Sequence, residues 1–179
     1  MCRVNNCEGL RLVNPSLAFE VEYTAMVREF LATGEPWFNN FELALADFPA
    51  FVQELQDEAQ GIGLPPDVVP QQTYWLANEQ QVLLGEIRLR PHLTPPFEQH
   101  NGHIGYNTRP SQRGKGYATC MLALVLDEAR QFGLSRMMLT IDGDNPASVR
   151  VIEKNGGWLD WQHVSHETGE MLSCYWIEL

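Results

Sequence analysis

Hydrophobic residues change their spacing along the chain, and these changes predict where helices and strands lie. After Asn14-Pro15, a pair that suits the start of a helix, helical spacing joins Phe19, Tyr23, Met26, Val27 and Phe30. Gly34 suits the end of that helix. Asp47 is expected to cap a second helix, whose inward residues are Phe48, Phe51, Val52 and Leu55. A loop follows over residues 61–71.

The remaining chain combines strand-like alternation with one long helical stripe. Strands are expected over residues 9–13, 73–78, 82–90, 102–108, 136–142, 158–164 and 171–179. The helical stripe is formed by Ala118, Met121, Leu122, Val125, Leu126, Ala129 and Phe132. Gly133 would follow its end, and Asn145-Pro146 would open a shorter helix. This order predicts an α/β fold of the α+β layered kind, with a mixed, largely antiparallel sheet and helices on both faces.

Length and charge limit the function classes. The 179 residues are expected to form a single domain, 1–179. Twelve Lys and Arg against 23 Asp and Glu give a net charge of −11, which disfavours binding to nucleic acid or to anionic membranes. A cationic small molecule or peptide would be attracted, although the charge would also serve solubility alone. No apolar stretch is long enough to span a membrane.

The four cysteines suggest a reducing compartment. Cys2, Cys7, Cys120 and Cys174 show no C-x-x-C spacing, and a chain of this size does not need a disulfide framework. We therefore expect reduced thiols and a cytoplasmic protein without a signal peptide. Cys120 would suit either a reactive thiol or a small packing residue.

A glycine-rich turn at residues 113–118 is the segment that most suggests chemistry. Gly114 and Gly116 allow a tight turn with no side chain in the path of a ligand. The helix predicted directly after them leaves unpaired N–H groups, which favour an anion. Arg113 and Lys115 add positive charge. A Walker-type loop is excluded because its spacing is absent, and a dinucleotide fingerprint because the turn lies mid-chain.

The segment Arg113-Gly114-Lys115-Gly116-Tyr117-Ala118 resembles the pyrophosphate loop of the GCN5-related N-acetyltransferases, the GNAT family. Residues 106–110 are similar to that family's fourth strand and its trailing proline. The motif that follows in the family is matched by Asn145, Ser148, Glu153, Lys154 and Gly156. The resemblance covers nearly the whole chain. It implies a splayed pair of parallel strands, here 102–108 and 136–142, with the cofactor-binding core over about 73–179.

The resemblance further implies that acetyl-CoA is the cosubstrate and lies between the splayed strands. Its pantetheine arm would pair with the first strand like an added strand, and a bulge near residues 106–108 would leave that edge free. The pyrophosphate would bind the N–H groups of residues 113–118. The implied cofactor-binding residues are Tyr106, Asn107, Thr108, Arg113, Gly114, Lys115, Gly116, Tyr117, Ala118, Asn145 and Ser148.

The family's reaction moves an acetyl group to a primary amine by direct attack in a ternary complex. A base must deprotonate the amine, and His103 and Glu86 are the candidates, although His103 would also suit a structural histidine and Glu86 a solvated strand position. Ile152 stands where many members carry a tyrosine acid. A thiolate with a pKa of about 8.5 needs little help from an acid. The candidate replacements for that acid are Tyr106, Tyr117 and Ser148.

Other functions remain compatible with the sequence. The missing tyrosine would suit a weakly active or inactive CoA-binding regulatory domain, and the same fold could transfer another acyl group or use another acceptor. The acceptor is expected to be an amine of a small molecule or peptide, and residues 1–72 are expected to shape the site that binds it. A homodimer is compatible with these features. No metal is expected, because the i, i+3 histidine pairs His100/His103 and His163/His166 would face opposite sides of a strand.

Overall fold

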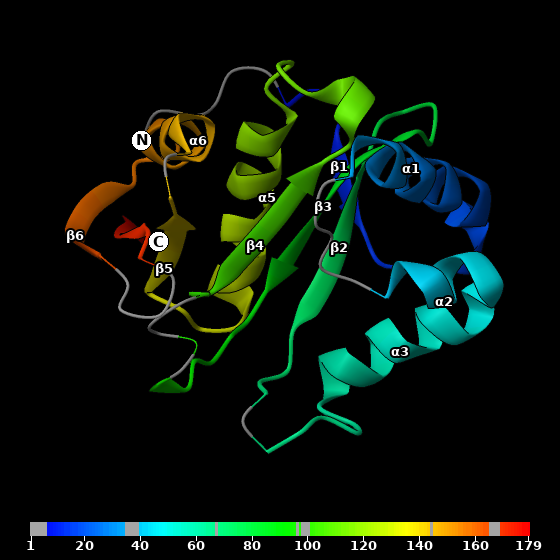
Figure 1. Cartoon of the computed structure of the whole chain (residues 1–179), viewed down its shortest axis with the longest axis horizontal. Helices are drawn as coiled ribbons and strands as arrows, with labels where there is room; N and C mark the ends of the chain where they lie inside the picture. The colour runs from blue at the N-terminus through cyan, green and yellow to red at the C-terminus, as the bar shows by residue number, and fades with distance from the viewer. Residues whose placement is uncertain are drawn as a thin grey trace.

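The computed structural model describes residues 7–34, 40–66, 68–95, 97, 101–143, 145–164 and 169–179. Within these ranges the chain forms two antiparallel sheets, in the orders β1-β2-β3-β4 and β5-β7-β6, and Figure 1 shows β4 and β5 running in the same direction where the sheets meet. The expected α/β fold with a splayed parallel pair is confirmed.

Every predicted strand is present within two residues of its expected bounds. The strands are β1 (Arg11–Val13), β2 (Gln72–Ala77), β3 (Leu83–Leu89), β4 (Ile104–Thr108), β5 (Arg136–Asp142), β6 (Trp158–Val164) and β7 (Met171–Glu178). The helices are α1 (Glu20–Thr33), α2 (Phe41–Ala46), α3 (Phe48–Gln60), α5 (Tyr117–Gln131) and α6 (Pro146–Lys154), with short 3₁₀ turns η1 (Leu17–Phe19) and η2 (Pro110–Gln112). The predicted turn between β6 and β7 lies mostly outside the described residues.

Helices cover the larger sheet on both faces. One face packs against α1, α2 and α3 around the fully buried Trp75, and this core contains every hydrophobic residue predicted to face inward from α1 and α3. The other face packs against α5, whose stripe joins both sheets in a second core. Figure 1 shows α1, α2 and α3 together on the side of the sheet away from α5 and α6.

The N-terminal helices differ from the prediction in two places. Asn14 and Pro15 do not begin α1, because the chain first makes η1 and the α-helix starts at Glu20. The sequence prediction also missed α2, whose Asn40 side chain caps it by accepting the N–H of Leu43. A helix of only 6 residues shows too little periodicity to be recognised. The predicted cap at Asp47 is confirmed, because its carboxylate accepts the N–H of Ala50.

Helix α5 ends one residue before the predicted stripe does. Phe132 is 44 % exposed and therefore does not belong to the core, because the helix stops at Gln131 and the chain turns away at Gly133. Gly133 has a φ of +81°, which fits the expected glycine at the helix end.

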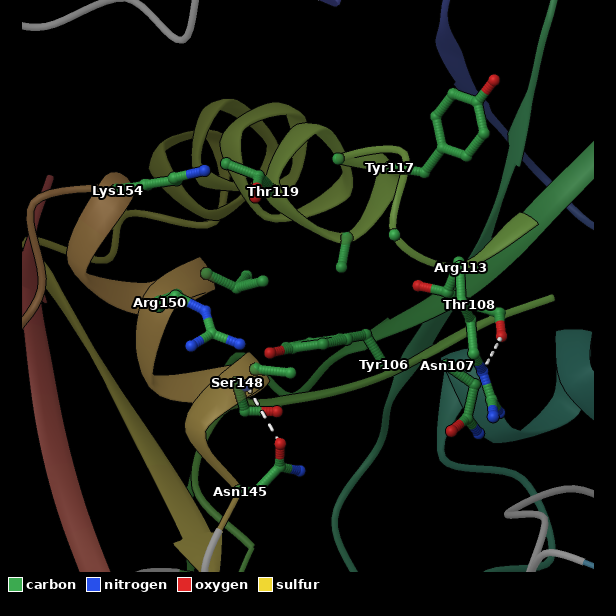
Figure 2. A pocket seen from close by; sticks show the side chains of 15 residues that line it. Tyr106, Asn107, Thr108, Arg113, Tyr117, Thr119, Asn145, Ser148, Arg150 and Lys154 are labelled. Carbon is green, nitrogen blue, oxygen red and sulfur yellow. Dashed lines mark hydrogen bonds between the residues drawn. The ribbon is translucent and has the colours of Figure 1, made fainter. Parts of the chain in front are cut away.

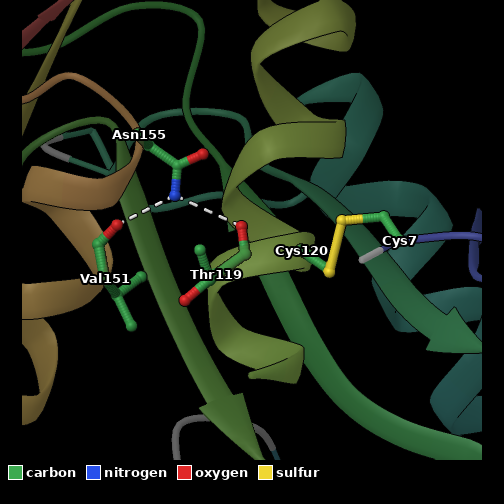
Figure 3. The surroundings of a disulfide bond; sticks show 5 residues. All are labelled: Cys7, Thr119, Cys120, Val151 and Asn155. Carbon is green, nitrogen blue, oxygen red and sulfur yellow. Dashed lines mark hydrogen bonds between the residues drawn. A yellow bond between two sulfur atoms is a disulfide. The ribbon is translucent and has the colours of Figure 1, made fainter. Parts of the chain in front are cut away.

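A disulfide joins Cys7 to Cys120, so the expectation of reduced thiols is wrong at these positions (Figure 3). Pairing of β1 with β2 carries the segment before β1 past the first turn of α5, and the two Cα atoms lie 5.5 Å apart. The cysteines are 113 residues apart, so no local spacing could reveal the pair. Cys174 is free and buried. The argument for a cytoplasmic protein from reduced cysteines is thereby lost.

Candidate active site

Strands β4 and β5 touch at one end and then diverge. At the closed end, the His103 N–H donates to the Met138 carbonyl at 2.8 Å, and the Met138 N–H donates to His103 Nδ1 at 3.0 Å. Beyond this point β5 pairs with β7 and β4 pairs with β3, which leaves the facing edges of β4 and β5 open to a ligand. The result is a V-shaped gap that begins at His103.

The open edge of β4 arises without the expected bulge. Pairing of β3 with β4 runs from Gly85↔Thr108 to Leu89↔Ile104 without a register shift, so the predicted bulge near residues 106–108 is wrong. The edge is free because β5 turns away to join another sheet, and no distortion of β4 is needed.

The glycine-rich turn has the conformation that its sequence predicts. Gly114 and Gly116 have φ values of +75° and +85°, which side chains with a Cβ rarely adopt. Gly116 is also the N-cap of α5 and offers no side chain to occupy the first N–H groups of the helix. Those groups and the positive end of the helix dipole face the turn, where an anion is stabilised.

Helix α6 forms the opposite wall of the gap. Asn145 begins the helix as predicted: its side chain accepts the N–H of Ser148 at 3.0 Å. Figure 2 shows this bond at the mouth of a cavity, with Ser148 facing Tyr106 of β4. The Asn155 amide then ties α6 to α5 by donating to the carbonyls of Thr119 and Val151, at 3.2 and 2.8 Å (Figure 3).

A cavity of about 620 Å³ lies between β4, the start of α5 and α6, which is the size of a cofactor site. The structure places all of the predicted cofactor residues except Lys115 in its lining. The Lys115 ammonium instead donates to Gln112 at 2.9 Å. The lining comprises Tyr106, Asn107, Thr108, Arg113, Gly114, Gly116, Tyr117, Ala118, Thr119, Asn145, Ala147, Ser148, Arg150, Val151 and Lys154.

Arg150 and Lys154 are lining residues that the sequence reasoning did not identify as binding groups. They lie four residues apart and therefore on one face of α6, and Figure 2 shows both side chains extending toward the cavity. Together with Arg113 they make this cavity positive in a protein of net charge −11. Their i, i+4 spacing after the Asn145 cap was the signal that could have found them.

Tyr106 and Ser148, two of the candidate acids, meet across the cavity. Burial raises the pKa of Tyr106, and the neighbouring Ser148 hydroxyl lowers it by a smaller amount. The pair does not reach hydrogen-bond geometry, so the buried Tyr106 hydroxyl has no partner among the described residues. A phenol with a raised pKa holds its proton, and a buried hydroxyl without a partner is a donor that would gain from a hydrogen bond to a ligand.

Glu86, a candidate base, lies on the other face of the sheet, outside the described lining of this cavity. Its side chain is only 1 % exposed, so the alternative of a solvated strand residue is wrong. One carboxylate oxygen accepts hydrogen bonds from Tyr23 and from the Trp75 indole, each at 3.0 Å. Across the β3–β4 ladder Glu86 is paired with Asn107, which borders the V-shaped gap.

His103, the second candidate base, sits at the apex of the V. Desolvation lowers the pKa of His103 to about 4, and the positive charge of Arg90 acts in the same direction. The Nδ1 lone pair is occupied by the Met138 N–H, so the neutral ring carries its proton on Nε2. This geometry leaves no free lone pair on the ring for an incoming amine.

No group of three or more His, Cys, Asp or Glu residues that could hold a metal occurs in the part of the chain that the structure describes. His100 and His166 of the weighed histidine pairs lie outside the described residues, and His163 stacks on Trp161 with ring centroids 4.8 Å apart. Among the described helices, none is long and apolar enough to cross a membrane.

A comparison with family models decides the family. The acetyltransferase (GNAT) domain model matches residues 25–157 of the 179. The chain belongs to the GNAT acetyltransferase family. No curated protein sequence matches this GNAT chain.

Solved structures share the GNAT fold at low sequence identity. The microcin C7 self-immunity acetyltransferase with acetyl-CoA and AMP is 14 % identical with a TM-score of 0.70, covering 96 % of this chain and 93 % of that one. RimL, the ribosomal L7/L12 α-N-protein acetyltransferase with coenzyme A, is 16 % identical with a TM-score of 0.69, covering 96 % and 95 %. Spermidine N-acetyltransferase from Vibrio cholerae with CoA and spermine is 16 % identical with a TM-score of 0.65, covering 95 % of each chain.

Proposed function

We propose that this GNAT protein is an acetyl-CoA-dependent N-acetyltransferase that acetylates a primary amine of a small molecule or peptide. One observation supports it above the others: the positive cavity of about 620 Å³ at the start of α5 is lined by the residues that the pyrophosphate-loop motif implicates. Similar structures with CoA or acetyl-CoA bound support the same cosubstrate.

The residues of the cavity suit the parts of acetyl-CoA. The first N–H groups of α5 and the side chain of Arg113 would bind the pyrophosphate, and Arg150 and Lys154 would add charge for its phosphates. The open edge of β4 at residues 106–108 offers backbone groups to the amides of pantetheine. Bound acetyl-CoA supplies a thioester acetyl group, and the chain's task is to bring an amine to it.

The amine must lose a proton, and Glu86 is the better of the two candidate bases. The His103 ring is held in place because its Nδ1 accepts the N–H of Met138, and this suits a structural role at the apex. Glu86 is a carboxylate paired across the ladder with Asn107, on the face of the sheet away from the cofactor cavity, and because it is buried the amine would lose its proton to it through a bridging water. The donors Tyr23 and Trp75 fix one of its oxygens, which orients the carboxylate for proton transfer.

The leaving thiolate needs no acid from the tyrosine position that Ile152 fills. Ile152 is 1 % exposed and packs in the core, so it contributes structure only. Tyr106 keeps its proton in the cavity and is the group best placed to donate a hydrogen bond to sulfur. A thiolate is an adequate leaving group near neutral pH, because its pKa is about 8.5.

The acceptor is expected to be cationic or neutral overall, because the protein carries a net charge of −11. Purified protein should release free thiol from acetyl-CoA when given a panel of polyamines, aminoacyl compounds and peptides with free N-termini. At least one amine should raise the rate well above hydrolysis, and mass spectrometry should show its acetylated product. CoA binding without acetyl transfer to any amine of a broad panel would favour the regulatory alternative, and transfer to hydroxyl compounds alone would favour another acceptor class.

A further inference from the structure

Helix α1 is joined to the segment that precedes the pyrophosphate loop by a network centred on Arg109. This residue follows β4 directly, and its side chain is only 12 % exposed. Arg109 Nε donates to Glu29 at 2.7 Å, and Nη1 donates to Glu22 at 2.9 Å and to the Leu83 carbonyl at 3.1 Å. Two acids of α1 thus hold the start of the loop against that helix.

Glu29 also reaches past Arg109 to the turn that leads into the loop. One of its oxygens accepts from Arg109, and the other accepts the backbone N–H of Ser111 at 3.0 Å. Ser111 belongs to η2, which leads directly into Arg113. The same carboxylate therefore holds both the residue before η2 and the middle residue of η2, the turn that leads into the loop.

A second contact from α1 acts on Arg113, one of the two cations of the loop. The Phe30 ring lies beneath the Arg113 guanidinium, with 5.5 Å between the guanidinium carbon and the ring centroid. Arg113 Nε also donates to the Thr108 carbonyl at 3.3 Å. Adjacent residues of α1 thus hold Arg109, Ser111 and the one loop arginine that lines the cofactor cavity.

We propose that Glu29 is a positioning residue for the cosubstrate: through Arg109 and Ser111 it holds the pyrophosphate loop in the shape that binds CoA. The inference rests on the proposed function. Preorganisation is the physical reason, since a loop already held in its bound shape loses less conformational freedom when the ligand arrives. Burial raises the pKa of Glu29, but the hydrogen bonds from Ser111 and Arg109 outweigh it and the pKa is lowered, so Glu29 is a carboxylate near neutral pH.

The Glu29→Gln substitution separates positioning from simple electrostatics. A carboxylate accepts from both donors, whereas an amide has one acceptor oxygen, so either Arg109 or Ser111 loses its bond. Arg109 keeps Glu22 as an ion-pair partner, so no cation is left without a carboxylate. Removing a negative charge near a polyanion should tighten binding by charge alone, so weaker binding would have to come from the loop.

The experiment measures CoA affinity by calorimetry for wild type, Glu29→Gln and the control Glu20→Gln. Glu20 is an exposed acid of the same helix, and its side chain makes no hydrogen bond or ion pair with any described residue. We expect Glu29→Gln to weaken CoA binding by about tenfold, the loss of one charge-assisted hydrogen bond. Glu20→Gln should leave the affinity unchanged or slightly raised.

Pantetheine supplies the readout that a general structural defect would not give. It shares the arm of CoA but lacks the pyrophosphate, so ligand-observed NMR should show the same affinity for wild type and Glu29→Gln. With an active acceptor, KM for acetyl-CoA should rise while kcat at saturation stays within about twofold. Equal or tighter CoA binding by Glu29→Gln, or equal weakening of CoA and pantetheine, overturns the inference alone. Wild-type protein that binds no CoA overturns the proposed function together with it.

Discussion

His103 and Met138 exchange two hydrogen bonds, at 2.8 and 3.0 Å, at the point where the two sheets meet. The first bond runs from backbone to backbone as in a normal ladder, and the second ends on the His103 ring. A side chain therefore takes over the pairing that the diverging strands can no longer continue.

The His103 ring should make stability sensitive to mild acid. The pKa of His103 is about 4 in the folded protein and ordinarily 6.5. The neutral ring therefore contributes fully to the free energy of unfolding above pH 6.5, and this contribution is lost as the pH falls toward 4. Relative to His103→Asn, which keeps an acceptor for Met138 but does not titrate, wild type should lose on the order of 3 kcal/mol of unfolding free energy over this range. Denaturant titrations at stepped pH measure the difference, and parallel pH curves for the two proteins would contradict it.

Gly116→Val should abolish tight CoA binding. Its φ of +85° strains any β-branched side chain, and the added atoms would project where the pyrophosphate is expected. Gly133→Val is the matched control, because Gly133 has a φ of +81° at the other end of α5, away from the cavity. Both variants should lose stability, but only Gly116→Val should lose more than about tenfold in CoA affinity by calorimetry. Equal affinity of Gly116→Val and wild type would place CoA elsewhere.

Arg150→Gln and Lys154→Gln should each weaken CoA binding by about three- to tenfold, since each removes one charge facing the phosphates. The apo protein should change little in stability, because relief of the repulsion between like charges four residues apart offsets the loss of the Lys154 cation at the C-terminal end of α6. Arg130→Gln on α5 serves as control: that residue pairs with Asp127 and lies outside the lining. Binding at two salt concentrations provides the measurement, and an unchanged salt dependence in both α6 variants would exclude them from the site.

Turnover should depend on Glu86 and much less on Ser148. Glu86→Gln keeps the acceptor for Tyr23 and Trp75 but removes the base, so kcat should fall by about a hundredfold or more. Ser148→Ala should cost less than about tenfold, because the thiolate leaves without an acid. Both are measured with one amine and saturating acetyl-CoA, beside His103→Asn as the control for the second candidate. If only the Ser148→Ala substitution lowers kcat strongly, Ser148 is the relocated acid and this assignment of roles is wrong.

Breaking the Cys7–Cys120 disulfide should lower stability without moving the cofactor residues. A closed loop of 113 residues restricts the unfolded chain, and its loss costs about 3 to 5 kcal/mol in the chain-entropy model. Cys7→Ser should show this loss in denaturant titrations without reductant, whereas Cys2→Ser, outside the described residues, should not. Alkylation of both Cys7 and Cys120 in unreduced, denatured protein would show that the bond does not form.

Local patterns predicted the strands, the long helix and ten of the fifteen residues that line the cavity, because glycine turns, caps and periodicity act over a few residues. Gly114, Gly116 and Asn145 belong to this class, and each adopts the predicted backbone or capping role. Long-range relationships were not predictable in the same way. For example, no pattern near Glu86 in the sequence indicates that Tyr23, 63 residues earlier, is its hydrogen-bond donor.

The errors have the same physical origin. The predicted bulge in β4 assumed that a free edge needs a local distortion, whereas the edge is free because β5 pairs with β7. The start of α1 was placed too early. Asn14 and Pro15 have the chemistry of a helix start, but the short turn η1 follows them and α1 begins only at Glu20. The catalytic residues stay predictions, since a base is defined by the position of an acceptor that no short motif specifies.

The disulfide also turns most of the molecule into a covalent ring. The stretch from Cys7 to Cys120 contains β1 to β4, the three N-terminal helices and the whole glycine-rich turn. Residues 1–6 and 121–179 lie outside the ring. The exposed residues after α3, among them Ile62, lie inside this ring. A protease that cuts there would open the ring without releasing a fragment, so a nicked molecule would keep its full mass on a denaturing gel until a reductant separated the pieces.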